Sequence, residues 1–76
     1  MMRMHREEIE QVLERPLSDA DLTHAADTSA ITALQEDNVR RLARWSRPLA
    51  VAYLRAVVPS CRMQEFLQLL ERLGVG

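Results

Sequence analysis

Lysine is absent from this 76-residue chain, and cysteine, glycine and aromatic residues are scarce. All ten basic residues are arginines, so no lysine can serve as a catalytic base, and forked contacts to carboxylate or phosphate are favoured. A GC-rich coding sequence would explain the same bias and is the simpler cause. The single cysteine, Cys61, excludes a disulfide within the chain and is typical of a reducing compartment.

Turn residues and long hydrophobic runs are also missing. Two glycines and three prolines provide little turn chemistry for β-structure. No run approaches the roughly 20 apolar residues of a membrane span, and the first residues show no signal-peptide pattern. We therefore expect a cytoplasmic protein. One cysteine and two histidines are too few for a structural metal site, and we expect no cofactor.

The length allows one domain, residues 1–76, with a core that must be aliphatic because only Trp45, Tyr53 and Phe66 are aromatic. A chain this short buries only about 60% of its unfolded surface. Without disulfides or metals, oligomerisation or docking on a larger partner is the expected source of further stability.

Apolar spacing and capping residues predict an all-α fold, a compact bundle of five or six short helices. The first helix is expected over residues 3–15, where Pro16 stops it. The second begins at the Ser18 cap, with Asp21 three residues on in a near capping box, and ends near Ala26.

The next segment leaves two interpretations open. Residues 27–29 are all capping types, so a third helix should start there. A polar stretch follows, in which Asp37 or Asn38 could cap a fresh helix that runs to Trp45. One long helix and two short ones both fit, and we favour two.

The last two helices have clearer patterns. Pro48 is expected as the first residue of a helix capped by Arg47, and residues 49–58 are apolar nearly all round, which predicts a central helix. Ser60 should cap the final helix, and Gly74 should end it. Its apolar stripe contains Met63, Phe66, Leu67, Leu70 and Leu73.

Charge is sorted along the chain. Residues 1–38 contain three arginines and nine acids, a net of −6, whereas residues 39–76 contain seven arginines and two acids, a net of +5. The densest basic cluster consists of Arg40, Arg41, Arg44 and Arg47, with Trp45 among them. This cluster suits an acidic protein surface, a nucleic acid or plain solvation, and we favour a protein because the net charge of the chain is −1.

The acids Glu7, Glu10 and Glu14 repeat on one side of the first helix and would provide the complementary face on a second copy of the chain. A solvated acidic face is the plainer interpretation. Cys61 is expected in the first turn of the last helix, where the helix dipole could activate its thiol, although a packing role is favoured. We find no paired acid–base groups, phosphate loop or metal cluster, so we expect no catalytic activity.

Residues 17–31 resemble a helix-turn-helix, which suggests as an alternative a small DNA-binding regulator or antitoxin that uses residues 29–47. The usual turn glycine is missing, and Glu36 and Asp37 would repel phosphate.

The Ser18 cap, the junction from Leu42–Trp45 to Pro48 and the final residues 66–73 together resemble the death-fold superfamily. The resemblance implies an interaction domain of the death-domain or caspase-recruitment type, including bacterial forms attached to defence effectors. It also implies homotypic assembly through opposed charged surfaces. The expected function is therefore a non-catalytic adaptor or assembly domain, whose partner and oligomeric state the sequence leaves open.

Overall fold

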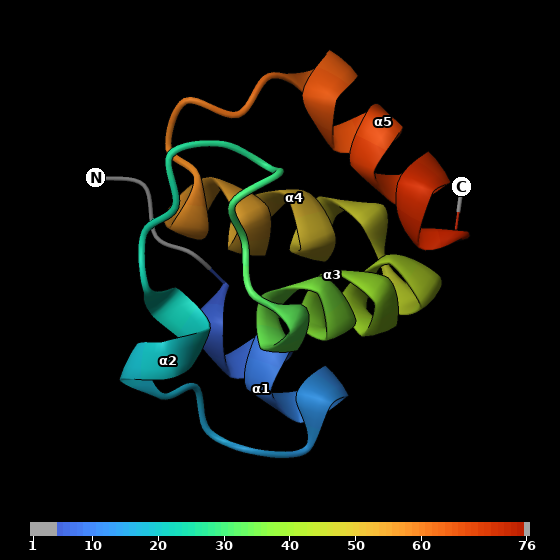
Figure 1. Cartoon of the computed structure of the whole chain (residues 1–76). Helices are drawn as coiled ribbons and strands as arrows, with labels where there is room; N and C mark the ends of the chain where they lie inside the picture. Colours follow the sequence, from blue (N-terminus) through green and yellow to red (C-terminus); the bar gives the residue numbers. More distant parts are fainter. Residues whose placement is uncertain (1–4, 76) are drawn as a thin grey trace.

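Two neighbouring helices, α3 and α4, form the middle of the molecule and run in roughly opposite directions (Figure 1). The computed structural model describes residues 5–75. Its helices are α1 (Arg6–Leu13), α2 (Asp19–Leu22), α3 (Ala33–Trp45), α4 (Arg47–Val57) and α5 (Met63–Leu73). In Figure 1, α1 and α2 lie below the central pair and α5 lies above it. Across the described residues the chain forms these five helices and no strand, which confirms the all-α bundle.

The core is aliphatic, as the composition predicts. It extends from Ile9 in α1 to Leu70 in α5 and includes two of the three aromatic side chains, Tyr53 and Phe66. Helix α4 exposes only Arg47, Pro48 and Arg55, because it packs against α1, α2 and α3 and its Val51 and Leu54 also lie beside Met63 and Phe66 of α5. The predicted central helix is thereby confirmed.

The first two helices are shorter than the sequence predicts. Helix α1 starts at Arg6 and ends where Glu14 adopts a left-handed conformation (φ 61°), before Pro16. Residues 3 and 4 of the predicted first helix lie outside the described residues. Helix α2 begins at Ser18 with the predicted capping box, in which the Asp21 carboxylate accepts the Ser18 N–H at 2.8 Å. The end of α1 and the start of α2 are therefore set by local signals.

The prediction that α2 reaches Ala26 is wrong, because backbone groups just beyond Leu22 bond to other helices. The Thr23 carbonyl accepts the Gln35 side-chain amide at 2.8 Å, and Ala25 N–H donates to the Val57 carbonyl at 2.9 Å. These bonds hold the chain in an extended form that a helix could not provide.

Helix α3 also begins later than predicted and does not break. Ser29 and Asp27 bond to one another in a turn, whereas Thr32 and Gln35 form a reciprocal capping box at 2.9 and 3.1 Å. The predicted start at residues 27–29 and the preference for two helices are both wrong. The polar stretch stays helical because Gln35 and Asn38 are buried with hydrogen-bond partners.

Two predicted caps shift by one or two residues. Ser46, not Arg47, caps α4, and Arg62, not Ser60, caps α5. Gly74 ends α5 in a left-handed conformation (φ 78°), as predicted. On α5 the apolar stripe is only partly buried, because Leu69 joins the core while Met63 and Leu67 stay 49% and 45% exposed.

Candidate functional site

The corner between α3 and α4 carries an exposed tryptophan. A single residue, Ser46, turns the chain: its N–H donates to the Leu42 carbonyl at 2.7 Å, and its hydroxyl accepts the Leu49 N–H at 3.5 Å. Trp45 lies beside this residue with 75% of its surface exposed. A large aromatic side chain in solvent leaves an unburied apolar area at a sharply defined position.

Three of the four predicted basic residues surround this tryptophan with free charges. Arg41, Arg44 and Arg47 are exposed and make no ion pair within residues 5–75. Arg41 lies four residues before Trp45 and so shares a face of α3 with it. We call the surface formed by Arg41, Arg44, Trp45 and Arg47 the basic corner. Arg40 differs, since its guanidinium lies 3.7 Å from the Asp37 carboxylate of the same helix.

The predicted acidic face is divided by the structure. Glu7 and Glu14 are exposed and make no ion pair within the described part of the chain. Glu10 instead accepts the Leu17 N–H at 2.6 Å and lies 3.4 Å from Arg6. The Glu10 carboxylate therefore links α1 to the segment before α2, so this residue has a structural role.

A hollow of about 510 Å³ separates the end of α1 from the corner. Its lining residues are Glu8, Gln11, Val12, Glu14, Trp45 and Leu49. We call it the corner hollow. The end of α1 and the corner between α3 and α4 lie on the same side of the molecule, at the right of Figure 1. Glu8, absent from the sequence prediction, joins Glu14 on the α1 wall, and Trp45 forms the opposite wall.

A largely buried polar network that the sequence analysis missed begins at Arg15, next in the chain to Glu14 of the hollow. Arg15, just after α1, donates to both carboxylate oxygens of Asp21 at 2.8 and 2.9 Å and to Asn38 of α3 at 2.8 Å. Asn38 in turn donates to Asp21 at 2.8 Å and to the Tyr53 hydroxyl at 3.0 Å. Tyr53 donates to the Asp21 carbonyl at 2.6 Å. The network therefore joins the segment just after α1 to α2, α3 and α4.

The electrostatics of this network follow from full burial of one carboxylate. The Arg15 guanidinium holds the pKa of Asp21 well below its usual range, with further help from the Ser18 and Asn38 donors, although burial acts the other way. Burial raises the pKa of Tyr53, so its hydroxyl stays a donor. The polar spacing of Gln35 and Asn38 on the buried face of α3 was the signal that could have revealed the network.

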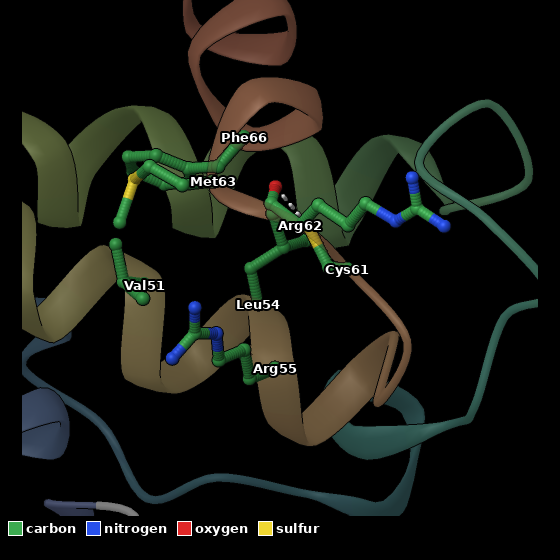
Figure 2. Close-up of a pocket in the computed structure, with 7 residues that line it drawn as sticks. All are labelled: Val51, Leu54, Arg55, Cys61, Arg62, Met63 and Phe66. Carbon is green, nitrogen blue, oxygen red and sulfur yellow. Dashed lines mark hydrogen bonds between the residues drawn. The ribbon is translucent and has the colours of Figure 1, made fainter.

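Cys61 lies in a different place and fits the packing interpretation. It precedes the cap of α5 and faces Leu54 beneath the turn, while the Arg62 side chain extends away from it (Figure 2). Burial raises the pKa of the Cys61 thiol, which opposes thiolate formation. The pocket around it has no room for a water molecule. The predicted position in the first helical turn is therefore wrong.

The geometry also bears on metal binding, on the helix-turn-helix alternative and on membrane spans. In residues 5–75 no group of three histidine, cysteine or acidic side chains could hold a metal ion. The helix-turn-helix resemblance is not matched in shape, because the long segment 23–32, rather than a tight turn, separates the single turn α2 from α3. None of the described helices combines the length and apolar character needed to cross a membrane.

In comparisons with known proteins, no family model, no curated protein and no solved structure matches the chain. The resemblance to the death-fold superfamily therefore stays a prediction.

Proposed function

We propose that the protein is a non-catalytic interaction module whose basic corner binds an acidic surface of another protein. The supporting observation is Trp45, three quarters exposed among three arginines that no acid neutralises within the described residues. Tryptophan and arginine are the residues most enriched at the energetic centres of protein interfaces. Exposed on one rigid corner, they present an apolar anchor and forked donors together.

The partner's chemistry follows from these groups. Guanidinium forks bind carboxylates in pairs, and an indole surface requires an apolar or aliphatic neighbour. The expected ligand is an acidic segment with an apolar residue beside its carboxylates. The lone Cys61 accords with a cytoplasmic, reducing location for such a module.

The test selects ligands from a displayed library of random peptides with the immobilised protein. We expect acidic peptides to be enriched and to change the emission of Trp45, the only tryptophan. The variant Arg44→Gln/Arg47→Gln should weaken their binding at least about tenfold, because the charge-assisted bonds are lost.

The matched control is Arg55→Gln/Arg62→Gln, which removes the same charge from exposed arginines elsewhere. It should leave peptide affinity unchanged. Equal weakening by both variants, or no enrichment of acidic peptides, would contradict the proposal. Binding of duplex DNA at low salt, where phosphate contacts are strongest, would instead support the DNA-binding alternative.

A further inference from the structure

We infer that the occupant of the corner hollow is a second copy of this chain, related by a two-fold axis, with Trp45 of each copy seated against the hollow of the other. This inference rests on the proposed function of the basic corner and names its partner.

Acidic and apolar residues are arranged in order across the corner hollow. The α1 wall of the corner hollow carries Glu8 and Glu14, and Val12 and Leu49 form its apolar part. The opposite wall is Trp45. Acidic groups therefore lie on one side of a central apolar strip.

Positive charge adjoins Trp45 in the chain. Arg44 precedes Trp45 and Arg47 follows Ser46, and both are exposed and absent from the lining of the hollow. We call these two arginines the basic edge, which in the inferred dimer lies beside the Trp45 wall. A two-fold rotation about the apolar strip brings the basic edge of each copy onto the acidic wall of the other, so the surface is complementary to itself.

The charged side chains beside the corner hollow are not neutralised by arginines or acids of the same copy within the described residues. In the part of the chain that the structure describes, Arg44, Arg47 and Glu14 make no ion pair, and Glu8 lies only near His5, at 3.2 Å. The acidic wall and the basic edge do not neutralise each other within the described residues. A second copy supplies the missing partner of both sets at once.

The corner hollow is large enough to admit a side chain of a second copy. A volume of about 510 Å³ falls within the range that encloses a drug-sized group, so an indole with a neighbouring arginine stem can enter. A 76-residue chain without disulfides gains from burying the exposed Trp45 in this way.

The experiment is sedimentation equilibrium on the full chain and two charge-reversed variants. Glu8→Arg/Glu14→Arg makes both edges basic, and Arg44→Glu/Arg47→Glu makes both acidic. Each variant alone should dissociate at least about tenfold more readily than wild type, because like charges then oppose each other twice. Mixed in equal amounts, the two variants should form a heterodimer in which both contacts are again attractive.

Controls separate folding from association. Arg55 and Arg62 are exposed and do not line the corner hollow, so the variant Arg55→Glu/Arg62→Glu should dimerise as wild type does. Far-UV circular dichroism should show that each variant keeps the helicity of wild type. If Glu8→Arg/Glu14→Arg fails to fold, the milder Glu8→Gln/Glu14→Gln takes its place. Seating of Trp45 should shift its emission to shorter wavelength as concentration rises.

Three outcomes would overturn the inference. Wild type could remain a monomer up to about 1 mM, the Kd of the weakest specific complexes. Reversed variants could dimerise normally, or the mixture could grow beyond a dimer with concentration, which indicates a head-to-tail contact. If wild type is monomeric yet binds acidic peptides at Trp45, only the second-copy inference fails and the proposed function stands.

Discussion

Asp21 shows how a single buried residue can determine much of a small fold. Its side chain is 0% exposed, yet its carboxylate accepts bonds from Arg15, Ser18 and Asn38. No buried side-chain nitrogen or oxygen of the described residues lacks a hydrogen-bond partner. A carboxylate so fully satisfied is strongly destabilising to remove, because its donors then lose their partner inside the protein.

We expect Asp21→Asn to lower the free energy of unfolding by about 3 kcal/mol, measured by urea denaturation. Asp19→Asn, an exposed change in the same helical turn, should alter it by about 0.5 kcal/mol or less. Similar effects for the two substitutions would contradict the role of the network.

The same carboxylate predicts acid sensitivity. Its folded pKa lies below its unfolded value of about 4, so its stabilising contribution is complete above that pH and is lost as the pH falls toward the folded pKa. Wild type should lose stability below about pH 4 with a steeper slope than Asp21→Asn, by up to about 1.4 kcal/mol per pH unit. Equal slopes in acid would show that Asp21 does not titrate differently on folding.

Cys61 gives a second prediction at this scale. Because the side chain is only 8% exposed and its pKa is raised, the native thiol should react with a disulfide reagent at pH 8 at least about tenfold more slowly than the urea-unfolded chain. Comparable rates would support the activated thiol that the sequence left as an alternative.

At the scale of elements, short-range caps decide where helices begin, but several capping residues compete. Residues 27–29 and Thr32 all have suitable side chains before α3. Thr32 prevails because Gln35 completes the reciprocal box, and the Gln35 amide also bonds to Thr23. The residue that caps α3 is therefore the one whose capping-box partner, Gln35, also bonds to another segment.

We expect Thr32→Ala to destabilise the protein by about 1 kcal/mol and to weaken amide-exchange protection in the first turn of α3. Ser29→Ala, at the start that the sequence favoured, should cost less than about 0.5 kcal/mol because its hydroxyl is exposed in a turn. The reverse order would place the functional cap at residues 27–29.

At the scale of the whole molecule, the longest link in the network joins α2 to α4. The Tyr53 hydroxyl donates to the Asp21 carbonyl across 32 residues of sequence and accepts from Asn38. This link positions the acidic half of the chain against the apolar central helix. The same network ties Arg15, just after α1, to Asn38 of α3.

Tyr53→Phe keeps the ring but removes the hydroxyl, and should cost about 1–2 kcal/mol in thermal or urea unfolding. Combined with Asp21→Asn it should cost less than the two single effects together, since both act on one network. Thr23→Val, which removes an exposed hydroxyl, is the control and should cost about 0.5 kcal/mol or less. Strict additivity would show that Tyr53 and Asp21 contribute independently.

Sequence alone determined the helical class, the aliphatic core, the Ser18 capping box, the Gly74 terminus and the nearly all-apolar α4. Each depends on interactions between residues a few positions apart, which periodicity and capping chemistry describe. The basic cluster around Trp45 was likewise visible because its members are neighbours in the chain.

Only tertiary structure decided the short α2, the unbroken α3 and the burial of Asp21, Gln35 and Asn38. It also decided that Glu10 is tied to Leu17 while Glu8 and Glu14 face Trp45 across a hollow. These features depend on partners from separate helices, and a polar side chain is stable in the interior only where such distant partners meet it.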